Sequence, residues 1–502
     1  MPLIDTDRRR RPGTSGRSRR ARVIGSGTVA VVAWGVLAFG AVYPWAYWTL
    51  AIASGLLGTA AYLGAARPLP SGAWSVMAAL ALVAATGLAQ TVPLPPGLRT
   101  TLSPATESFL RVTDVPYAAA LALQEQGSSI GAPRRPLSID PAATWRAVAL
   151  VAAFTVLLAG LCRHFGQAGT RGVIPAIIAL GAVVAMIGIV QKATLGDHAW
   201  GGMKIYGFWA PRYKLTTPFG PFVNKNHYAG WMLLALPLAI GHLIALAETG
   251  IARGRRGWRE RIVWLSSPEG GRLQLTAAAI GLMAAALALT KSRSGIACFA
   301  VTLVVAAAAA ARRYRSLKGR LVVAGALLSL MVLPLLWANV DLASRFTSGG
   351  QSVELRRQAW HDALAIVRDF PLTGTGLNTY GRATLVYDTA ATDLHFQEAH
   401  NDYLQLAAEG GLLVGIPALV AIACVIAGIG RALAADRNEP ARYWARFGAA
   451  TGLAAMALQS VVEFSLQMPG IAVLFVVLCA IALHEAPHVE RRRQCVTAPA
   501  QT

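Results

Sequence analysis

Histidine and asparagine are neighbours at two places where a polar stretch of this sequence meets a long apolar run, and at one of them a lysine precedes the pair. The first pair is His400 and Asn401, and the second group is Lys225, Asn226 and His227. An imidazole at the boundary between water and lipid can gain or lose a proton near neutral pH, so His400 is a candidate base. The alternatives are a hydrated histidine that caps a helix and a lysine that extends its ammonium from lipid into water.

Further charged positions lie at or within the apolar runs. Lys291 and Arg293 occupy a tight turn between two runs, and Arg356 stands near the start of a segment with helical periodicity. These cations suit an anion site, although headgroup anchoring explains the first two equally well and plain solvation explains Arg356. Glu463 lies within an apolar run, where a carboxylate is costly enough that we expect a partner or a functional role.

Together these side chains predict a cationic rim that carries an imidazole, and a lipid diphosphate is the ligand that fits it. Arginine and lysine can neutralise diphosphate oxygens in a leaving group, while histidine can remove a proton from an attacking hydroxyl. A polyprenyl diphosphate is already activated for transfer. We therefore expect that the reaction uses no cofactor and no metal ion.

Two common catalytic motifs are not expected to operate. The sequence contains no G-x-x-x-x-G-K-[ST], which argues against a P-loop ATPase. His484, Glu485 and His488 match the H-E-x-x-H spacing of zinc proteases, but Pro487 disfavours a helical residue before it. We expect a helix end there, without zinc.

The elements that must position these residues are membrane helices. Of the 502 residues, 55% are hydrophobic and only 14% are charged, and the apolar residues form charge-free runs of the length that crosses a bilayer. We expect an all-α polytopic membrane protein with about twelve transmembrane helices. The predicted spans are approximately 23–42, 46–66, 73–92, 144–162, 172–191, 227–247, 273–290, 294–311, 321–340, 404–430, 447–467 and 470–486.

The net charge of +22 is a signal of membrane topology, because the basic residues are unequally distributed among the connections. Most of them fall on the side that holds both termini, so the positive-inside rule places the termini in the cytoplasm and no nucleic-acid partner is required. A membrane domain, 23–486, is therefore predicted to follow a disordered basic cytoplasmic arm, 1–22, and to precede a cytoplasmic tail, 487–502.

The long connections, about 93–143, 192–226 and 341–403, all fall on the opposite, outer side. Loops beyond about 15 residues are usually functional or disordered, so we expect function there. In the third loop, Trp360, Ala363, Leu364 and Val367 recur at helical spacing, which predicts an amphipathic helix over about 353–369.

These residues give the sequence a resemblance to the O-antigen ligase and polymerase family of bacterial inner-membrane glycan transferases. His400 and Asn401, nine further residues and then Gly411 follow the family signature, although Val414 stands where the family carries Gly, Thr or Tyr. The other similar segments are 220–230, 290–295, Arg356 with Trp360, 371–376 and 462–469.

The resemblance implies a GT-C-like protein of polysaccharide and lipopolysaccharide biosynthesis. Such a protein moves a glycan from undecaprenyl diphosphate to an acceptor hydroxyl at the periplasmic face of the inner membrane, without metal. The acceptor would be lipid A core, a growing glycan or a protein. By position, His400 would be the base and Arg293 would act on the diphosphate. The expected substrate-binding residues are Lys225, Arg356, Asn401, Lys291, Asn226 and His227.

A transporter or flippase of lipid-linked sugars is the alternative class, because it could use the same rim for binding alone. A flippase would favour charges along a path through the bundle. The charges of this sequence concentrate instead on one face, which favours an enzyme.

Overall fold

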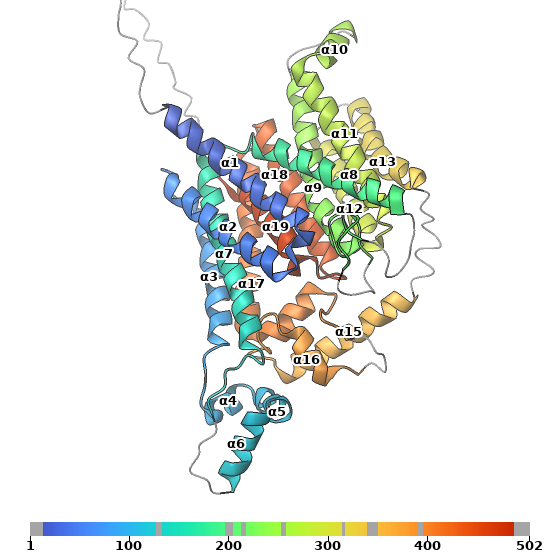
Figure 1. The fold of residues 1–502 in the computed structure, drawn as a ribbon. Coiled ribbons are helices and arrows are strands. Elements are labelled where there is room, and N and C mark those ends of the chain that lie inside the picture. Colours follow the sequence, from blue (N-terminus) through green and yellow to red (C-terminus); the bar gives the residue numbers. More distant parts are fainter. Residues whose placement is uncertain are drawn as a thin grey trace, which may run out of the picture.

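The computed structural model describes residues 14–126, 133–195, 204–211, 217–252, 258–313, 317–338, 350–389 and 395–485. Within these ranges the chain forms helices and a few isolated β-bridges, and no strand. Figure 1 shows a bundle of long helices with short helices at both ends. The prediction of an all-α polytopic membrane protein is confirmed.

Each of the twelve predicted spans overlaps a helix of the bundle. These helices are α1 (Thr14–Leu37), α2 (Pro44–Gly64), α3 (Ser71–Ala89), α7 (Pro141–Ala168), α8 (Val173–Leu195), α9 (Lys225–Ala252), α11 (Pro268–Leu289), α12 (Arg293–Arg313), α13 (Leu317–Trp337), α17 (Asp402–Ala435), α18 (Pro440–Gln459) and α19 (Pro469–Leu483). Within the described ranges, nine helices are long and apolar enough to cross a membrane. The other three are α18, and α13 and α19 with their shorter apolar stretches.

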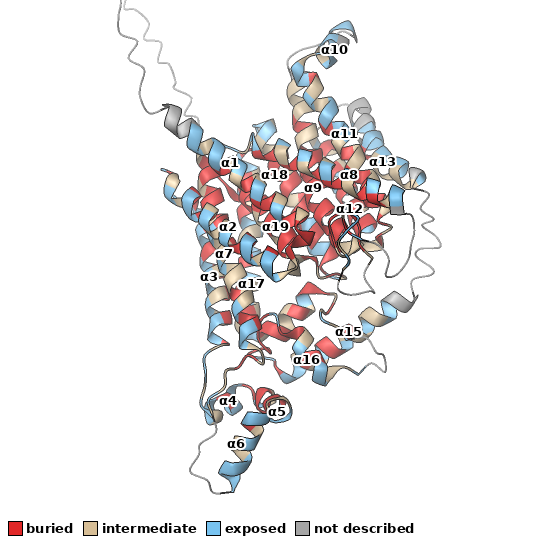
Figure 2. Cartoon of the chain, in the orientation of Figure 1, coloured by how far each residue is buried: buried red, intermediate tan, exposed pale blue. Residues whose placement is uncertain are grey.

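The centre of the bundle is formed by α9, α18 and α19, which Figure 2 colours mostly as buried. α19 contains no charged residue and contacts α18, α7, α1 and α9, as expected of a helix that is apolar on every side. Gly241 of α9 and Gly448 of α18 face each other, and a Cβ on Gly241 would lie 3.0 Å from the Cα of Gly448. Small residues therefore let these two helices pack backbone to backbone.

The two ends of the bundle carry different structures (Figure 1). At the lower end in this view lie α4 (Pro96–Leu102), α5 (Pro104–Thr113), α6 (Val115–Glu125), α15 (Gly350–Asp369) and α16 (Tyr380–Tyr387). We call this the loop end. The short helix α10 (Trp258–Leu265) lies at the opposite end.

The first predicted loop, 93–143, contains the three helices α4 to α6, each with proline in its first turn. Arg99 of α4 is fully buried and pairs with Glu107 of α5, and the Tyr117 hydroxyl of α6 donates to the same carboxylate. A buried guanidinium needs such partners. The ion pair therefore joins α4 to α5, and the Tyr117 hydroxyl adds α6 to the same carboxylate.

The prediction of a disordered arm over 1–22 is wrong for its second part, because α1 begins at Thr14. Arginine is a good helix former, so the basic residues extend α1 beyond its apolar run. Residues 1–13 and the predicted tail, 487–502, lie outside the described residues.

The predicted amphipathic helix of the third loop is α15, and its buried face differs slightly from the expected one. Ala363, Ile366 and Phe370 are buried, and together with side chains of α16 and α17 they form a small apolar core. The prediction was right for Ala363 and wrong for Leu364, which is 43% exposed. The difference arises because packing against α16 and α17, rather than the bundle surface alone, selects the face.

Candidate active site

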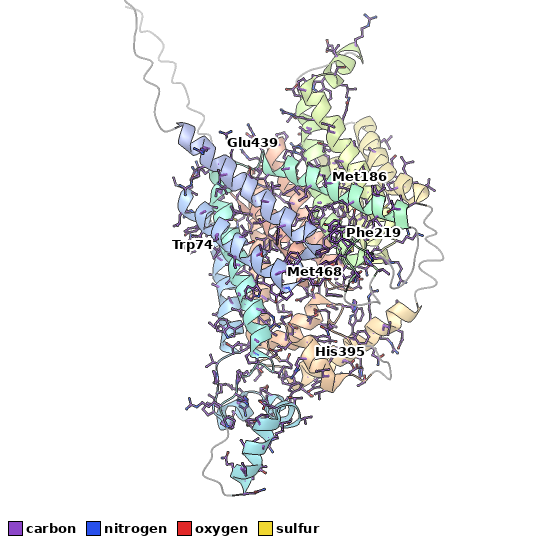
Figure 3. All side chains as sticks on the ribbon, in the orientation of Figure 1. Trp74, Met186, Phe219, His395, Glu439 and Met468 are labelled. Carbon is purple, nitrogen blue, oxygen red and sulfur yellow. The ribbon has the colours of Figure 1, made fainter. Side chains whose placement is uncertain are left out.

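A break between α18 and α19 forms the inner wall of the candidate site. α18 ends at Gln459, and the short 3-10 helix η2 (Ser465–Gln467) precedes α19. Glu463 lies in this break, so its predicted place inside the span 447–467 is wrong. The polar residues that end α18 bond to other segments: Gln459 donates to the Asn226 carbonyl, and Ser460 to Asp402. In Figure 3, Met468, at the end of the break, lies between Glu439 and His395.

Glu463 is fully buried and receives polar partners from two other helices. Its Oε1 is paired with the guanidinium of Arg356 on α15 and accepts a hydrogen bond from Asn226 Nδ2 on α9 at 2.7 Å. The Asn226 side chain also accepts from Ser292 Oγ, directly before α12, at 2.8 Å. The expected partner of Glu463 is thus present: α15 and α9 each supply a side chain to one buried carboxylate, and Ser292 joins through Asn226.

His400 lies against the same carboxylate. Its Nδ1 is 3.8 Å from Glu463 Oε2, and its side chain is 28% exposed. The backbone of His400 has a φ of +50°, which is rarely adopted by a residue with a side chain, and its carbonyl accepts from Trp360 Nε1 at 3.4 Å. A strained backbone held in this way indicates that the position of the imidazole is set by its surroundings.

Phe464 packs against two imidazole rings. One is that of His227 on α9, and the other is that of His400, which precedes α17. The ring centroids of His227 and His400 lie 4.6 Å and 4.8 Å from that of Phe464, both edge to face. The two histidines differ in access, because His227 is buried whereas His400 is partly exposed. Of these two, only His400 is therefore positioned to meet a ligand from outside.

Asn401, the residue after His400, has a structural role at the start of α17. It is the N-cap of α17, and its side-chain oxygen accepts from the backbone N–H groups of Tyr403 and Leu404, each at 3.0 Å. Asn is among the best N-cap residues because it satisfies donors that a helix start leaves free. The expectation that Asn401 binds substrate thus has a competing explanation in this cap.

Three cations lie at the edge of the site, because each is next in the sequence to a residue that contributes to it. They are Lys225, Lys291 and Arg293. Lys225 is the first residue of α9 and precedes Asn226. Lys291 and Arg293 flank Ser292, and Arg293 is the first residue of α12. α9, α12 and α17 therefore all begin at this site, and the partial positive charge of a helix N-terminus favours an anion.

The spacing between His400 and Gly411 corresponds to the first segment of α17. At Gly411 the helix is interrupted, with a φ of +53° and a ψ of −156°, a conformation that essentially only glycine adopts. The freed N–H groups of Leu412 and Leu413 donate to the carbonyls of Pro371 and Leu372, each at 2.9 Å. The interruption at Gly411 therefore allows the backbone of α17 to bind the 371–376 turn.

The same turn is fixed from α3 by Gln90, whose side chain is fully buried. Its Nε2 donates to the carbonyls of Thr373 and Glu409, and its Oε1 accepts from Leu377 N–H at 3.2 Å. The Glu409 carboxylate in turn accepts from the backbone of Asn378 at 2.7 Å. Residues 371–376, which the sequence singled out, thus anchor the loop end to the membrane bundle.

A carboxyl group next to this anchor titrates unusually. Burial raises the pKa of Glu398 to about 8, and the nearby carboxylates of Glu409 and Asp402 act in the same direction. The Gln405 amide opposes the rise by donating to Glu398, and it also donates to Glu409 at 3.2 Å. Glu398 lies two residues before His400. Its protonated carboxyl is therefore part of the structure that supports the site.

Sequence reasoning named Glu463 only as a carboxylate in need of a partner, and it missed Ser292 and Phe464. The signal for Ser292 was its place between Lys291 and Arg293. For Phe464 it was the neighbouring Glu463. Neither signal showed which distant helix each residue contacts.

The arrangement combines a partly exposed imidazole, a buried carboxylate next to it, several cations and three helix N-termini. An imidazole of this kind can take a proton from a hydroxyl. Cations and helix N-termini can bind an anionic leaving group. The site is therefore suited to moving a group from an anionic carrier to a hydroxyl.

In a comparison with known protein families, residues 278–419 match the family model described as O-antigen ligase. No curated protein matches the chain. The matched segment runs from α11 into α17 and contains Arg293, Arg356 and His400. Asn226 and Glu463 lie on either side of it. The predicted resemblance to this family is confirmed by the match.

Proposed function

We propose, from the O-antigen ligase domain that this membrane protein carries, that it transfers a glycan from a polyprenyl diphosphate carrier to an acceptor hydroxyl. The domain supports ligase- or polymerase-type glycan transfer in polysaccharide biosynthesis. The single observation that carries the finer proposal is the partly exposed His400 imidazole against the buried Glu463, at the loop end. Both the lipid carrier and the acceptor can reach a site at the end of the bundle.

In this proposal His400 acts as the base. The acceptor hydroxyl loses its proton to the imidazole while its oxygen attacks the anomeric carbon of the glycan. The bond between that carbon and the diphosphate breaks, and the electron pair leaves with undecaprenyl diphosphate. General base catalysis of this type typically contributes about 10²- to 10⁴-fold in rate.

The cations would stabilise the charge that develops on the diphosphate. Arg293 and Lys225, at the first positions of α12 and α9, are the proposed main contacts, with Lys291 nearby. Arg356 is paired with Glu463, although a guanidinium has further donors that could reach the donor lipid. Because the diphosphate already activates the glycan, this mechanism includes no nucleotide and no metal step.

We place the reaction at the periplasmic face of the bacterial inner membrane, with both termini in the cytoplasm. The basis is the distribution of Lys and Arg among the connections, which assigns the loop end to the outside. The long predicted outer loops contribute α4 to α6 at this end, together with α15 and α16.

Glycan profiles from a deletion strain would test the proposal. Loss of glycan from lipid A core would indicate a ligase, and products with a single repeat unit would indicate a polymerase. Loss of glycan from a surface protein would indicate a protein glycosyltransferase. Accumulation of lipid-linked sugar at the cytoplasmic face would contradict transfer and indicate a flippase.

A further inference from the structure

Two buried polar atoms face each other at the centre of the site. Nδ1 of His400 and Oε2 of Glu463 are 3.8 Å apart, and in the described part of the chain neither has a hydrogen-bond partner. A buried polar atom without a partner is unfavourable, because it has lost its hydrogen bonds to water. A small movement of the imidazole toward the carboxylate would satisfy both atoms at once.

One oxygen of the Glu463 carboxylate is already occupied by polar partners. This oxygen, Oε1, is held by Arg356 of α15 and by the amide of Asn226 of α9. The other titratable groups that face it are His227 on α9 and Asp402 on α17. Arg356 is the one permanent cation of this set. Glu463 therefore keeps a partner for Oε1 while Oε2 remains available to His400.

We propose that Glu463 is a positioning residue that acts through His400, a role that rests on the proposed glycan transfer. Its Oε2 accepts a hydrogen bond from Nδ1–H of the imidazole, which fixes the tautomer in which Nε2 carries the lone pair. Nε2 then takes the proton of the acceptor hydroxyl, and the imidazolium that forms is stabilised by the carboxylate. When the product leaves, Nε2 releases this proton to water and the neutral tautomer returns.

The orientation of the ring supports this assignment. Phe464, the next residue after Glu463, contacts the imidazole edge to face, and Trp360 holds the His400 carbonyl. Because Nδ1 is buried while the side chain is 28% exposed, the accessible part of the ring lies away from Glu463. The segment 463–464 therefore both aligns the imidazole and turns Nδ1 inward.

Steady-state transfer by Glu463→Gln tests the proposal. The protein is reconstituted in proteoliposomes with lipid-linked glycan extracted from the source cells, and their lipid A core, glycan and protein fractions are supplied in turn as acceptor. Release of undecaprenyl diphosphate is measured from pH 5 to 9. A glutamine can donate to Nδ1 and so favour the wrong tautomer, and we expect kcat to fall at least 10²-fold while KM for the donor changes less than about threefold.

The pH profile and a conservative variant separate positioning from a structural effect. Without the carboxylate the imidazolium is less stable, so the acid limb of the kcat profile should move to lower pH in Glu463→Gln. Glu463→Asp keeps a carboxylate and should recover part of kcat. Glu439→Gln, a change at the exposed start of α18, is the matched control and should behave like the parent.

Three outcomes would overturn the proposal: transfer by Glu463→Gln at the parental rate, a higher KM with an unchanged pH profile, or no recovery in Glu463→Asp. If Glu463→Gln does not fold, the pH profile of Glu463→Asp decides, since an unchanged acid limb and an unchanged kcat would contradict positioning. Failure of the proposed function is distinguishable, because the parental protein would then release no undecaprenyl diphosphate with any acceptor fraction.

Discussion

The imidazole of His400 and the carboxylate of Glu463 meet where the start of α17 approaches the break between α18 and α19, with Nδ1 and Oε2 3.8 Å apart. His400 precedes a helix start, whereas Glu463 follows a helix end. The site is thus built from helix termini, which bring polar backbone and side chains to the edge of an apolar bundle.

Gly411→Ala should destabilise the protein by about 1–3 kcal/mol, because a left-handed, glycine-only conformation is required there. The new Cβ would also lie 2.6 Å from the backbone nitrogen of Gly374. Thermal unfolding in detergent measures the loss. Gly415→Ala is the matched control in the same helix, since a Cβ there meets nothing within 4 Å. Equal stabilities of the two variants would contradict the role of the interruption.

Asn401→Ala should lower stability by about 1 kcal/mol, because it removes the N-cap of α17. Asn401→Ser should keep most of that stability, since serine caps helices about as well as asparagine does. Thermal unfolding of both variants, followed by transfer assays, separates the cap from a contact with substrate. If the serine variant is as unstable as the alanine variant, the capping explanation fails.

Glu398 should make stability depend on pH. Its pKa of about 8 in the folded protein lies above the ordinary value of 4.5, so the folded state binds the proton more tightly than the unfolded state. The stabilisation is complete below about pH 4.5 and is lost as the pH rises through 8. Its size is on the order of 1 kcal/mol for each unit of difference, as an upper bound.

Glu398→Gln imitates the protonated carboxyl and should remove this dependence. Relative to the parent, the variant should gain thermal stability between pH 5 and pH 9. Glu439→Gln, which changes an exposed carboxylate, should show no such gain. A constant difference between Glu398→Gln and the parent over this range would show that Glu398 is ionised throughout.

Arg293 should affect donor binding as well as turnover, because a diphosphate carries its charge in both the ground and transition states. Arg293→Ala should therefore weaken binding of lipid-linked glycan and slow transfer, and Arg293→Lys should restore charge without the two-pronged geometry. Likewise, Lys225→Arg should retain more transfer than Lys225→Ala. Binding of the donor lipid and transfer are measured on variants that insert at normal levels. Parental binding and turnover in Arg293→Ala would indicate headgroup anchoring.

The sequence predicted more of the scaffold than of the site. Apolar runs of about 20 residues marked the twelve helices of the bundle, because the bilayer imposes that length. His400 and Asn401 were found from their place at the start of a run. The contact between His400 and Glu463 could not be predicted, since it depends on how α17 packs beside α18. The end of α18 at Gln459 was missed because Val461 and Val462 continue the apolar pattern.

The most direct test compares transfer by the parental protein and by His400→Ala in proteoliposomes that contain lipid-linked glycan and the acceptor fraction, whether lipid A core, glycan or protein, with which the parent is most active. Release of undecaprenyl diphosphate is followed with and without a chelator of divalent metals. We predict that the parent is active in both conditions and that His400→Ala is at least 10²-fold slower while it still binds the donor lipid. Near-parental transfer by His400→Ala would contradict the account, because the imidazole would then not be the base.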